Sequence, residues 1–589
     1  MRAILCLLVV SGACRKPAPN ESPPQGSAAS RPSTSTPSTT PSTTPSTSTP
    51  SQASPGYDAA ALGALKFEVS GGSPEARTHF THGLLALHSF WYDEASHQFD
   101  AAITADPTFS MAYWGLAMSK SKLLWGDDDL AGGQDALKRM PNADKLTPRE
   151  QAWVVAALSL FRRANVDVRT SRADFLSVME QVNAKFPDDE AALFLSLALL
   201  STVQPGDPNE VALRTRAGEL AMKVYEHNPN HPGAAHYIIH AFDTPDLAPR
   251  ALPAARAYAK IAPAAFHAQH MPAHIFVRLG MWDPAVASCQ AAWDSSVAWV
   301  KRDKLSIDHE DFHSLAWLVE LNFERGHRAD AGVAMKVYGD AVRTGLPADK
   351  RAAYANQVAS FLARTDEWSK VDEYLAPLEA PAITPVSGGG VACGHAPGPA
   401  GAPTELFEKR AVLATRALAA AMLHDPAAVT RFLDQRDGVD AELRPFLLAT
   451  QPKQFVESGD KLRGIVRASL IARAEQDDRA LVAALEPLAV DEDTEFTGEG
   501  TAGGMLAHEQ IAEALVRLGQ PTKALAEYKY VLAQHPGRAR SLLGAARLTA
   551  KLGDAVTAGT FYKKLAASWS SADVGTPGLD EARRRSSGK

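Results

Sequence analysis

The chain has 589 residues, of which 22% are charged, and its formal net charge is -7. Lys and Arg are scattered rather than clustered, which argues against a nucleic-acid-binding protein, because such a protein needs a basic face to neutralise phosphates. The length is large for one compact core, but a repeat solenoid escapes this limit since each unit contacts only its neighbours.

The segment 1–14 is typical of a short export signal. Arg2 precedes an apolar run over residues 3–10, which is too short to cross a bilayer as a stable helix. Small residues then lead to Cys14, which resembles the lipobox of bacterial lipoproteins, although Ser11 stands where that family usually has Leu. The resemblance implies a lipid on Cys14 and an outer-membrane lipoprotein that faces the periplasm or the cell surface. Secretion without a lipid is the alternative.

Residues 15–56 are nearly all Ser, Thr, Pro, Ala and Gly, with Thr-Pro-Ser repeated. Such side chains bury too little apolar surface to offset the entropy lost when the chain becomes ordered. The composition predicts a disordered tether, so we expect contact with the membrane only through the lipid anchor.

From residue 57 the sequence is Ala-rich with helical periodicity, and one segment has the spacing of a tetratricopeptide repeat. Small residues at Gly83 and Ala95 let two helices of a hairpin approach closely, and Phe99 fills the space that they leave. Ala102 continues the small positions, and Pro107 ends the second helix. The segment therefore predicts one helix pair of a repeat solenoid.

The same register recurs further along the chain with the tetratricopeptide period, which is about 34 residues. In the C-terminal part, Gly519, Ala524 and Tyr528 recur one period later as Gly553, Ala558 and Tyr562. In the middle of the chain, Ala251 recurs one period later as Ala285. Gly280, which falls at the expected turn between two helices, and Ala285 then recur as Gly326 and Ala331 after one period plus an insertion of about 12 residues, around 297–311.

These periods predict an all-α fold, a right-handed superhelical solenoid of antiparallel helix pairs of the tetratricopeptide type, with several degenerate repeats. We expect repeats over 57–380 and again over 405–575. Residues 381–404 are rich in Gly and Pro and predict a surface loop between them. Residues 576–589 are expected to form a polar tail.

Histidine is the unusual residue of this sequence. Of 18 histidines, four pairs have the His-x-x-x-His spacing, which places both rings on one helix face. The pair His236 and His240 recurs one tetratricopeptide period later as His270 and His274. Both pairs therefore occupy equivalent positions on the first helix of consecutive repeats.

In tetratricopeptide proteins these positions line the concave groove of the solenoid, and the resemblance implies that several histidines share one inner wall. Neutral imidazoles on adjacent helices suit Zn, Cu, Ni or Fe, so His236, His240, His270 and His274 are the candidate metal ligands. The full set of expected groove residues is His236, His240, Asp243, His267, His270, His274, Arg278, His313, Glu320 and Glu324.

Two segments carry a more specific resemblance, HYIIHAF at 236–242 and HAQHMPAHIFVRLGMW at 267–282. They resemble a signature of large bacterial tetratricopeptide proteins of uncharacterised function, and the similarity extends to Gly326 and to the C-terminal repeats. The resemblance supports the fold and implies no particular chemistry.

The segment 309–313 reads His-Glu-Asp-Phe-His, the H-E-x-x-H spacing of zinc metalloproteases. It straddles the insertion and the start of a helix, and the H-x-x-G-x-x-H continuation is missing. The alternative is that His309 and Glu310 cap the helix while His313 faces the groove.

The sequence thus favours a cell-envelope scaffold, rather than an enzyme, that binds a peptide or protein partner through a histidine-lined groove and does not bind nucleic acid. An anionic ligand held by the rings and Arg278 is also open. The alternative function is a metal-binding or metal-dependent hydrolase site built from the same histidines, with a transition metal such as Zn as the cofactor.

Overall fold

The computed structural model describes residues 59–587 except 126, 162–166, 205, 384–402, 451–452 and 495–503. The expected export signal, Cys14 and the tether 15–56 lie outside the described residues, as does most of the expected loop 381–404. The described residues are helical except for turns, irregular connecting segments and one short antiparallel ladder, β1 (Ser121–Lys122) with β2 (Asp127–Asp128). The expected all-α helical-repeat solenoid is confirmed.

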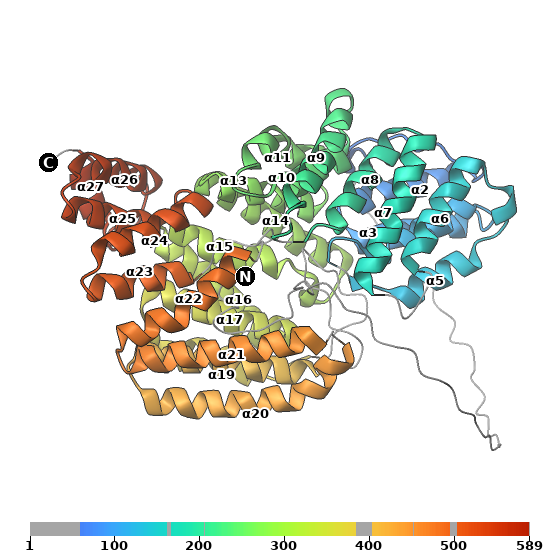
Figure 1. Ribbon diagram of the computed structural model, residues 1–589. Coiled ribbons are helices and arrows are strands. Elements are labelled where there is room, and N and C mark those ends of the chain that lie inside the picture. Colours follow the sequence, from blue (N-terminus) through green and yellow to red (C-terminus); the bar gives the residue numbers. More distant parts are fainter. Residues whose placement is uncertain are drawn as a thin grey trace, which may run out of the picture.

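The helices follow one another in three stretches (Figure 1). The first comprises η1 (Ala59–Leu62), α2 (Pro74–His88), α3 (Tyr92–Ala105), α4 (Ser110–Met118), α5 (Leu130–Arg139), η2 (Ala143–Lys145), α6 (Pro148–Phe161), α7 (Val168–Lys185), α8 (Asp189–Ser201) and α9 (Glu210–His227). The second comprises α10 (Pro232–Phe242), α11 (Ala248–Ile261), α12 (Phe266–His270), α13 (Pro272–Arg278), α14 (Trp282–Asp303), η3 (Ile307–His309), α15 (Phe312–Glu324), α16 (Arg328–Gly345), α17 (Ala348–Thr365), η4 (Trp368–Lys370), α18 (Val371–Leu375) and η5 (Ala376–Glu379). The third comprises α19 (Thr404–Met422), α20 (Pro426–Thr450), α21 (Lys453–Ala474), α22 (Asp478–Thr494), α23 (Ala507–Arg517), α24 (Pro521–Gln534), α25 (Ala539–Lys551), α26 (Ala555–Ser568) and α27 (Leu579–Ser586).

The first repeat packs as its small and aromatic residues predict. Phe99 of α3 is fully buried. A Cβ added to Gly83 of α2 would lie only 2.8 Å from its ring, and a Cβ added to Gly115 of α4 would lie only 2.2 Å from it. The same arrangement recurs in the C-terminal repeats, where a Cβ on Gly544 would lie 2.4 Å from the ring of Tyr528. Glycine on one helix therefore makes room for an aromatic ring on its neighbour.

The expected insertion around 297–311 lengthens a helix. Helix α14 has 22 residues and ends at Asp303, and η3 then leads to α15. Gly280 and Gly326 lie at the turns before α14 and before α16, with φ values of +67° and +80°. Both turns are therefore where the sequence predicts them.

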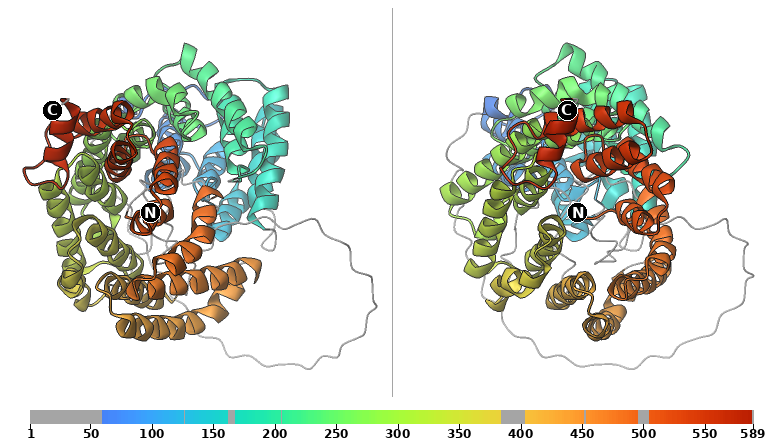
Figure 2. Two further views of the ribbon diagram at one scale, coloured as in Figure 1. Left: turned by 60° about the vertical axis from the view of Figure 1, so that its left-hand side comes forward. Right: turned by 90° about the vertical axis from the view of Figure 1, so that its left-hand side faces the viewer.

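The solenoid winds back on itself, so separate repeats meet (Figure 2). On the C-terminal side, Nε1 of Trp569 donates to the carbonyl of Glu324 at 3.0 Å, and the backbone N–H of Asp573 donates to the carbonyl of Gly326 at 3.1 Å. On the N-terminal side, the ring of Trp91 lies against those of Phe266 and Trp299. Segments from both ends of the chain thus contact the middle helices.

The expected polar tail 576–589 contains a helix. In α27 the side chains of Leu579 and Ala582 are buried against the last repeat, and Glu581 forms an ion pair with Arg547. Spacing of three residues places the two apolar side chains on one face, so the segment caps the solenoid.

Within the described ranges, we find no helix that is both long and apolar enough to span a membrane.

Candidate metal centre

Six of the expected groove histidines come together in the middle of the solenoid. Their helices follow from local sequence: α10 begins at Pro232, which suits the first turn of a helix, and Pro272 lacks the N–H that would join α12 to α13. His236 and His240 lie on α10, His267 and His270 on α12, His274 on α13, and His313 on α15.

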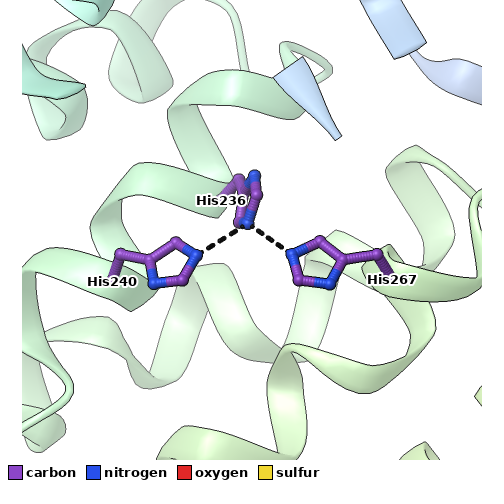
Figure 3. A group of neighbouring side chains, drawn as sticks. All are labelled: His236, His240 and His267. Carbon is purple, nitrogen blue, oxygen red and sulfur yellow. Dashed lines mark hydrogen bonds between the residues drawn. The ribbon is translucent and has the colours of Figure 1, made fainter. Parts of the chain in front are cut away.

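His236, His240 and His267 form what we call the first triad (Figure 3). The Nε2 atom of His236 lies 3.0 Å from Nε2 of His240 and 3.0 Å from Nε2 of His267. Nδ1 of His236 donates to the backbone carbonyl of His88 at 2.6 Å. Because Nδ1 carries the hydrogen, Nε2 of His236 presents a lone pair toward two other ring nitrogens.

Aromatic rings enclose the first triad. Phe90, in the turn between α2 and α3, lies edge-on to His236 with ring centres 4.3 Å apart, and Tyr258 of α11 stacks on the ring of His236 at 5.2 Å. Burial lowers the pKa of His236 to about 3 and lowers the pKa of His240 and of His267 well below the usual value. The rings are therefore neutral at neutral pH, which is the form that binds metals.

His270, His274 and His313 form the second triad, in which the three ring nitrogens lie within 4.8 Å of one another. The Nε2 atoms of His270 and His274 are 3.1 Å apart. Nδ1 of His274 lies 2.9 Å from Oδ2 of Asp243, and Nδ1 of His270 lies 2.9 Å from Oγ of Ser314. Both rings are thereby held in place by buried polar groups.

Asp243, at the end of α10, connects this triad to the positively charged side chain of Arg278. Its other oxygen accepts a hydrogen bond from Nε of Arg278 at 2.9 Å, and both side chains are buried. Burial opposes the charge on Asp243, but Arg278 and His274 together lower the pKa of the carboxyl. Arg278 is thus bound to Asp243 inside the protein, whereas the sequence suggested that it helps hold an anionic ligand.

The two expected glutamates lie in a different network. Glu320 accepts a hydrogen bond from Nε2 of Gln357 at 2.9 Å, and Glu324 accepts bonds from Arg364 and from the backbone N–H of Ala539, both at 2.7 Å. Among the described residues, neither belongs to a group with ligand atoms close to the histidines. These carboxylates link α15 to α17 and to the C-terminal repeats.

A third cluster, which we call the His–Glu–His bridge, has no counterpart among the sites that the sequence predicts. Glu190 of α8 accepts hydrogen bonds from Nε2 of His88 at 2.7 Å and from Nε2 of His231 at 3.0 Å, and all three side chains are fully buried. Burial would raise the pKa of Glu190, but the two rings lower it to about 2. Each ring nitrogen faces one carboxylate oxygen, which is the pattern of a hydrogen-bonded link between α2, α8 and α10.

The segment 309–313 does not present its two histidines together. His309 ends η3, beside Asp308 and the ring of Trp299, whereas His313 lies in the first turn of α15 with the second triad. The helix cap is Asp311, whose side chain accepts from the N–H of Ser314, so the expectation that His309 and Glu310 cap the helix is wrong. The two rings therefore lack the single helix face that a zinc-protease motif needs.

The expected groove residues are buried rather than spread along an open wall. His236 and His270 are 0% exposed, and His240 has the largest exposure of the set at 9%. The turn of Phe90 and Trp91 covers α10 and α12 from the N-terminal side. The contacts of this turn arise from chain closure over long separations, so no local spacing in the sequence predicted them, nor the roles of Ser314, His88 and Glu190.

No family model matches this chain, and no curated protein matches it. Among solved structures, the chain is similar to yeast Tom70, with a TM-score of 0.27 and 10% identity over 87% of this chain and 88% of that one. It is also similar to Naa15/Naa10 bound to HypK-THB (TM-score 0.19, 12% identity, 87% and 91% covered) and to the TPR domain of P58(IPK) (0.17, 12%, 87% and 98%). At these scores the tetratricopeptide-like assignment rests on this chain's own helix pairs and repeat register.

Proposed function

We propose that this protein binds a first-row transition-metal ion at the first triad. The observation that carries the proposal is the lone pair on Nε2 of His236, which faces the Nε2 atoms of both His240 and His267 at 3.0 Å. One lone pair accepts one well-aligned hydrogen, so hydrogen bonding alone does not account for both approaches. A metal ion between three imidazole nitrogens accounts for both at once.

The spacing supports the same interpretation. For Zn–N bonds of about 2.0–2.1 Å in a tetrahedral site, ligand nitrogens are separated by roughly 3.3 Å. Two of the three separations, from His236 to His240 and to His267, are 3.0 Å and so are close to this value, and all three nitrogens lie within 4.8 Å of one another. Neutral imidazole ligands suit Zn, Cu, Ni or Fe, whereas Mg and Ca prefer oxygen ligands.

The hydrogen bond from His236 to the carbonyl of His88 supports the site further. Metal-bound histidines almost always donate their second ring nitrogen to a carboxylate or a backbone carbonyl, which fixes the tautomer and the ring orientation. Three protein ligands leave a fourth coordination position, so a bound ion would have room for water or another small ligand.

The test is metal analysis of the full-length chain, purified without tag or chelator. We expect a bound transition metal, with a nitrogen-rich first shell by X-ray absorption, and loss of at least one equivalent in His240→Phe. The matched control is His231→Phe, which removes an equally buried ring from the His–Glu–His bridge and should leave the metal content unchanged. Absence of metal, even after the apoprotein is titrated with Zn²⁺ and Cu²⁺, would refute the proposal.

We also propose that the protein is exported and anchored in the cell envelope. The export signal and the lipobox-like Cys14 support a lipid-anchored protein of the cell envelope, where the long tether would hold the solenoid away from the membrane. Burial of the histidines argues against binding of a protein or peptide partner through the expected histidine-lined groove. Labelling of cells with a radioactive fatty acid, compared with Cys14→Ser, tests the anchor.

A further inference from the structure

We infer that the second triad binds its own transition-metal ion, so that this chain holds two ions side by side in its interior. The inference rests on the proposed function, to which it adds a second site with a different ligand set: His270, His274 and His313. It is carried by the tautomers of His270 and His274, which the surrounding hydrogen bonds fix independently of the first triad.

The tautomer of His274 follows from Asp243. A carboxylate only accepts hydrogen bonds, so Nδ1 of His274, at 2.9 Å from Oδ2, must carry the hydrogen. The other carboxylate oxygen accepts a hydrogen bond from Nε of Arg278 at 2.9 Å, so the carboxylate is paired with a buried cation. Nε2 of His274 therefore carries no hydrogen and presents a lone pair.

The tautomer of His270 follows from Ser314. The hydroxyl of Ser314 donates to Oδ2 of Asp311, whose other oxygen already accepts the backbone N–H of Ser314. With its hydrogen committed to Asp311, the Ser314 oxygen accepts from Nδ1 of His270 at 2.9 Å. Nε2 of His270 therefore also carries no hydrogen and presents a lone pair.

Two lone pairs thus face each other, because the Nε2 atoms of His270 and His274 are 3.1 Å apart. Neither nitrogen supplies a hydrogen to the other, and two acceptors at this distance in a buried site repel. A cation between them turns the repulsion into two ligand bonds. His313 supplies the third nitrogen, and its ring centre lies 4.8 Å from that of His270.

The two triads share their framework. Helix α12 carries His267 of the first triad and His270 of the second, one turn apart. Helix α10 carries His236 and His240 and ends beside Asp243, which orients His274. The ring centres of His240 and His274 are 6.5 Å apart. Two Cu²⁺ ions held in this way would be close enough for their unpaired electrons to interact.

The experiment measures metal stoichiometry in the full-length chain and in single-ring variants. The apoprotein is loaded with Cu²⁺ or Zn²⁺, freed of excess ion, and analysed for metal per chain. We expect two equivalents in the wild type, one in His313→Phe, one in His267→Phe and none in the double variant. His231→Phe should retain two. Circular dichroism checks that each variant is folded.

A second readout needs no variant. In the wild type loaded with two equivalents of Cu²⁺, the electron paramagnetic resonance signal should be broadened or lost because neighbouring ions couple. With one equivalent, a larger share of the Cu²⁺ should give the sharp signal of an isolated ion. Two equivalents with uncoupled signals would show that the two ions are not neighbours and would overturn the inference.

The remaining outcomes separate the two claims. One equivalent in the wild type, lost in His267→Phe and kept in His313→Phe, would overturn the second site and leave the proposed function standing. One equivalent lost in either variant would mean a single shared site and would also overturn the inference. No metal in the wild type would refute the proposed function itself.

Discussion

The Nε2 atoms of His236 and His267 lie 3.0 Å apart, although the two rings are 31 positions apart in the chain. The contact joins α10 to α12 across α11, and it is held from outside the repeat by the carbonyl of His88, which accepts from Nδ1 of His236. The position of the ring thus depends on a residue that lies 148 positions earlier. Packing of repeats against one another, not one helix alone, brings the nitrogens together.

The role of Asp243 is testable with a change that preserves shape. Asp243→Asn removes the acceptor-only carboxylate that fixes the tautomer of His274, so we expect the affinity of the second triad for Zn²⁺ to fall by about 10–100-fold. The first triad should keep its affinity, because its central ring is held by the carbonyl of His88. Competition titrations with a chromophoric chelator measure both sites.

A matched control for this variant is Glu509→Gln, which alters an equally buried carboxylate in the C-terminal repeats. Its metal affinities should be those of the wild type. An unchanged second affinity in Asp243→Asn would show that the carboxylate does not orient the ring.

Close packing around Phe99 predicts a large penalty for one methyl group. A Cβ on Gly115 would lie 2.2 Å from the ring of Phe99, so Gly115→Ala should destabilise the N-terminal repeats by about 1–3 kcal/mol. Because a smaller side chain would relieve the clash, Phe99→Leu in the same chain should recover part of this loss. Hydrogen exchange of α2 to α4 gives the local free energies and the coupling between the two changes.

The comparison variant is Gly438→Ala. Gly438 lies on α20, and a Cβ there would meet nothing within 4 Å. Removing glycine from a helix interior without a clash should stabilise the helix by up to about 1 kcal/mol. Equal effects of the two alanine substitutions would contradict the packing argument.

The buried pair of Glu509 and Arg538 holds the last repeats together. Two hydrogen bonds, of 2.8 and 2.7 Å, join the guanidinium to the carboxylate, and both side chains are almost fully buried. Glu509→Gln leaves the arginine without this counter-charge, so we expect a loss of about 3–5 kcal/mol at pH 7. Hydrogen exchange in α23 to α25 provides the measurement, since a solenoid unfolds in parts.

The same pair predicts a pH dependence. Burial alone would raise the pKa of Glu509, but Arg538 lowers it from 4.5 to about 2. A lowered carboxyl pKa contributes stability that is present above about pH 4.5 and is lost as pH falls toward 2. The difference between wild type and Glu509→Gln should therefore be constant between about pH 5 and 7 and shrink below about pH 4.5.

An exposed pair supplies the contrast. Arg517 and Asp478 form an ion pair at 2.7 Å, with 48% and 18% of the side chains exposed. Solvent screening leaves such pairs worth less than about 1 kcal/mol, so Asp478→Asn should have a small effect. A loss comparable to that of Glu509→Gln would argue against burial as the cause.

The His–Glu–His bridge is predicted to be structural. Glu190→Gln removes a charge that accepts from both His88 and His231, so we expect a loss of about 1–3 kcal/mol in the local stability of α8 to α10, measured by hydrogen exchange. Metal content should not change, because these rings direct their Nε2 hydrogens to Glu190. Glu75→Gln, at an exposed position of α2, is the control. A missing metal equivalent in Glu190→Gln would reassign the bridge as a metal site.

Prediction from the sequence succeeded where the interactions are local. The fit of Phe99 against Gly83 and the turns at Gly280 and Gly326 depend on residues within one repeat length. It failed where one residue's partner lies far along the chain. The helix position of Glu320 predicts that it lies with the histidines, but its carboxylate accepts a hydrogen bond from Gln357 of α17.

The sequence by itself determined the helical repeat and the pairing of His236 with His240 and of His270 with His274, because a spacing of four residues fixes both rings on one helix face. Only the tertiary structure decided that His267 completes one triad and His313 the other, and that the rings are buried. The reason is that closure of the superhelix brings Phe90 and Trp91 onto α10, α12 and α14. The packing of distant helices, which no local spacing specifies, sets which nitrogens meet and removes water from them.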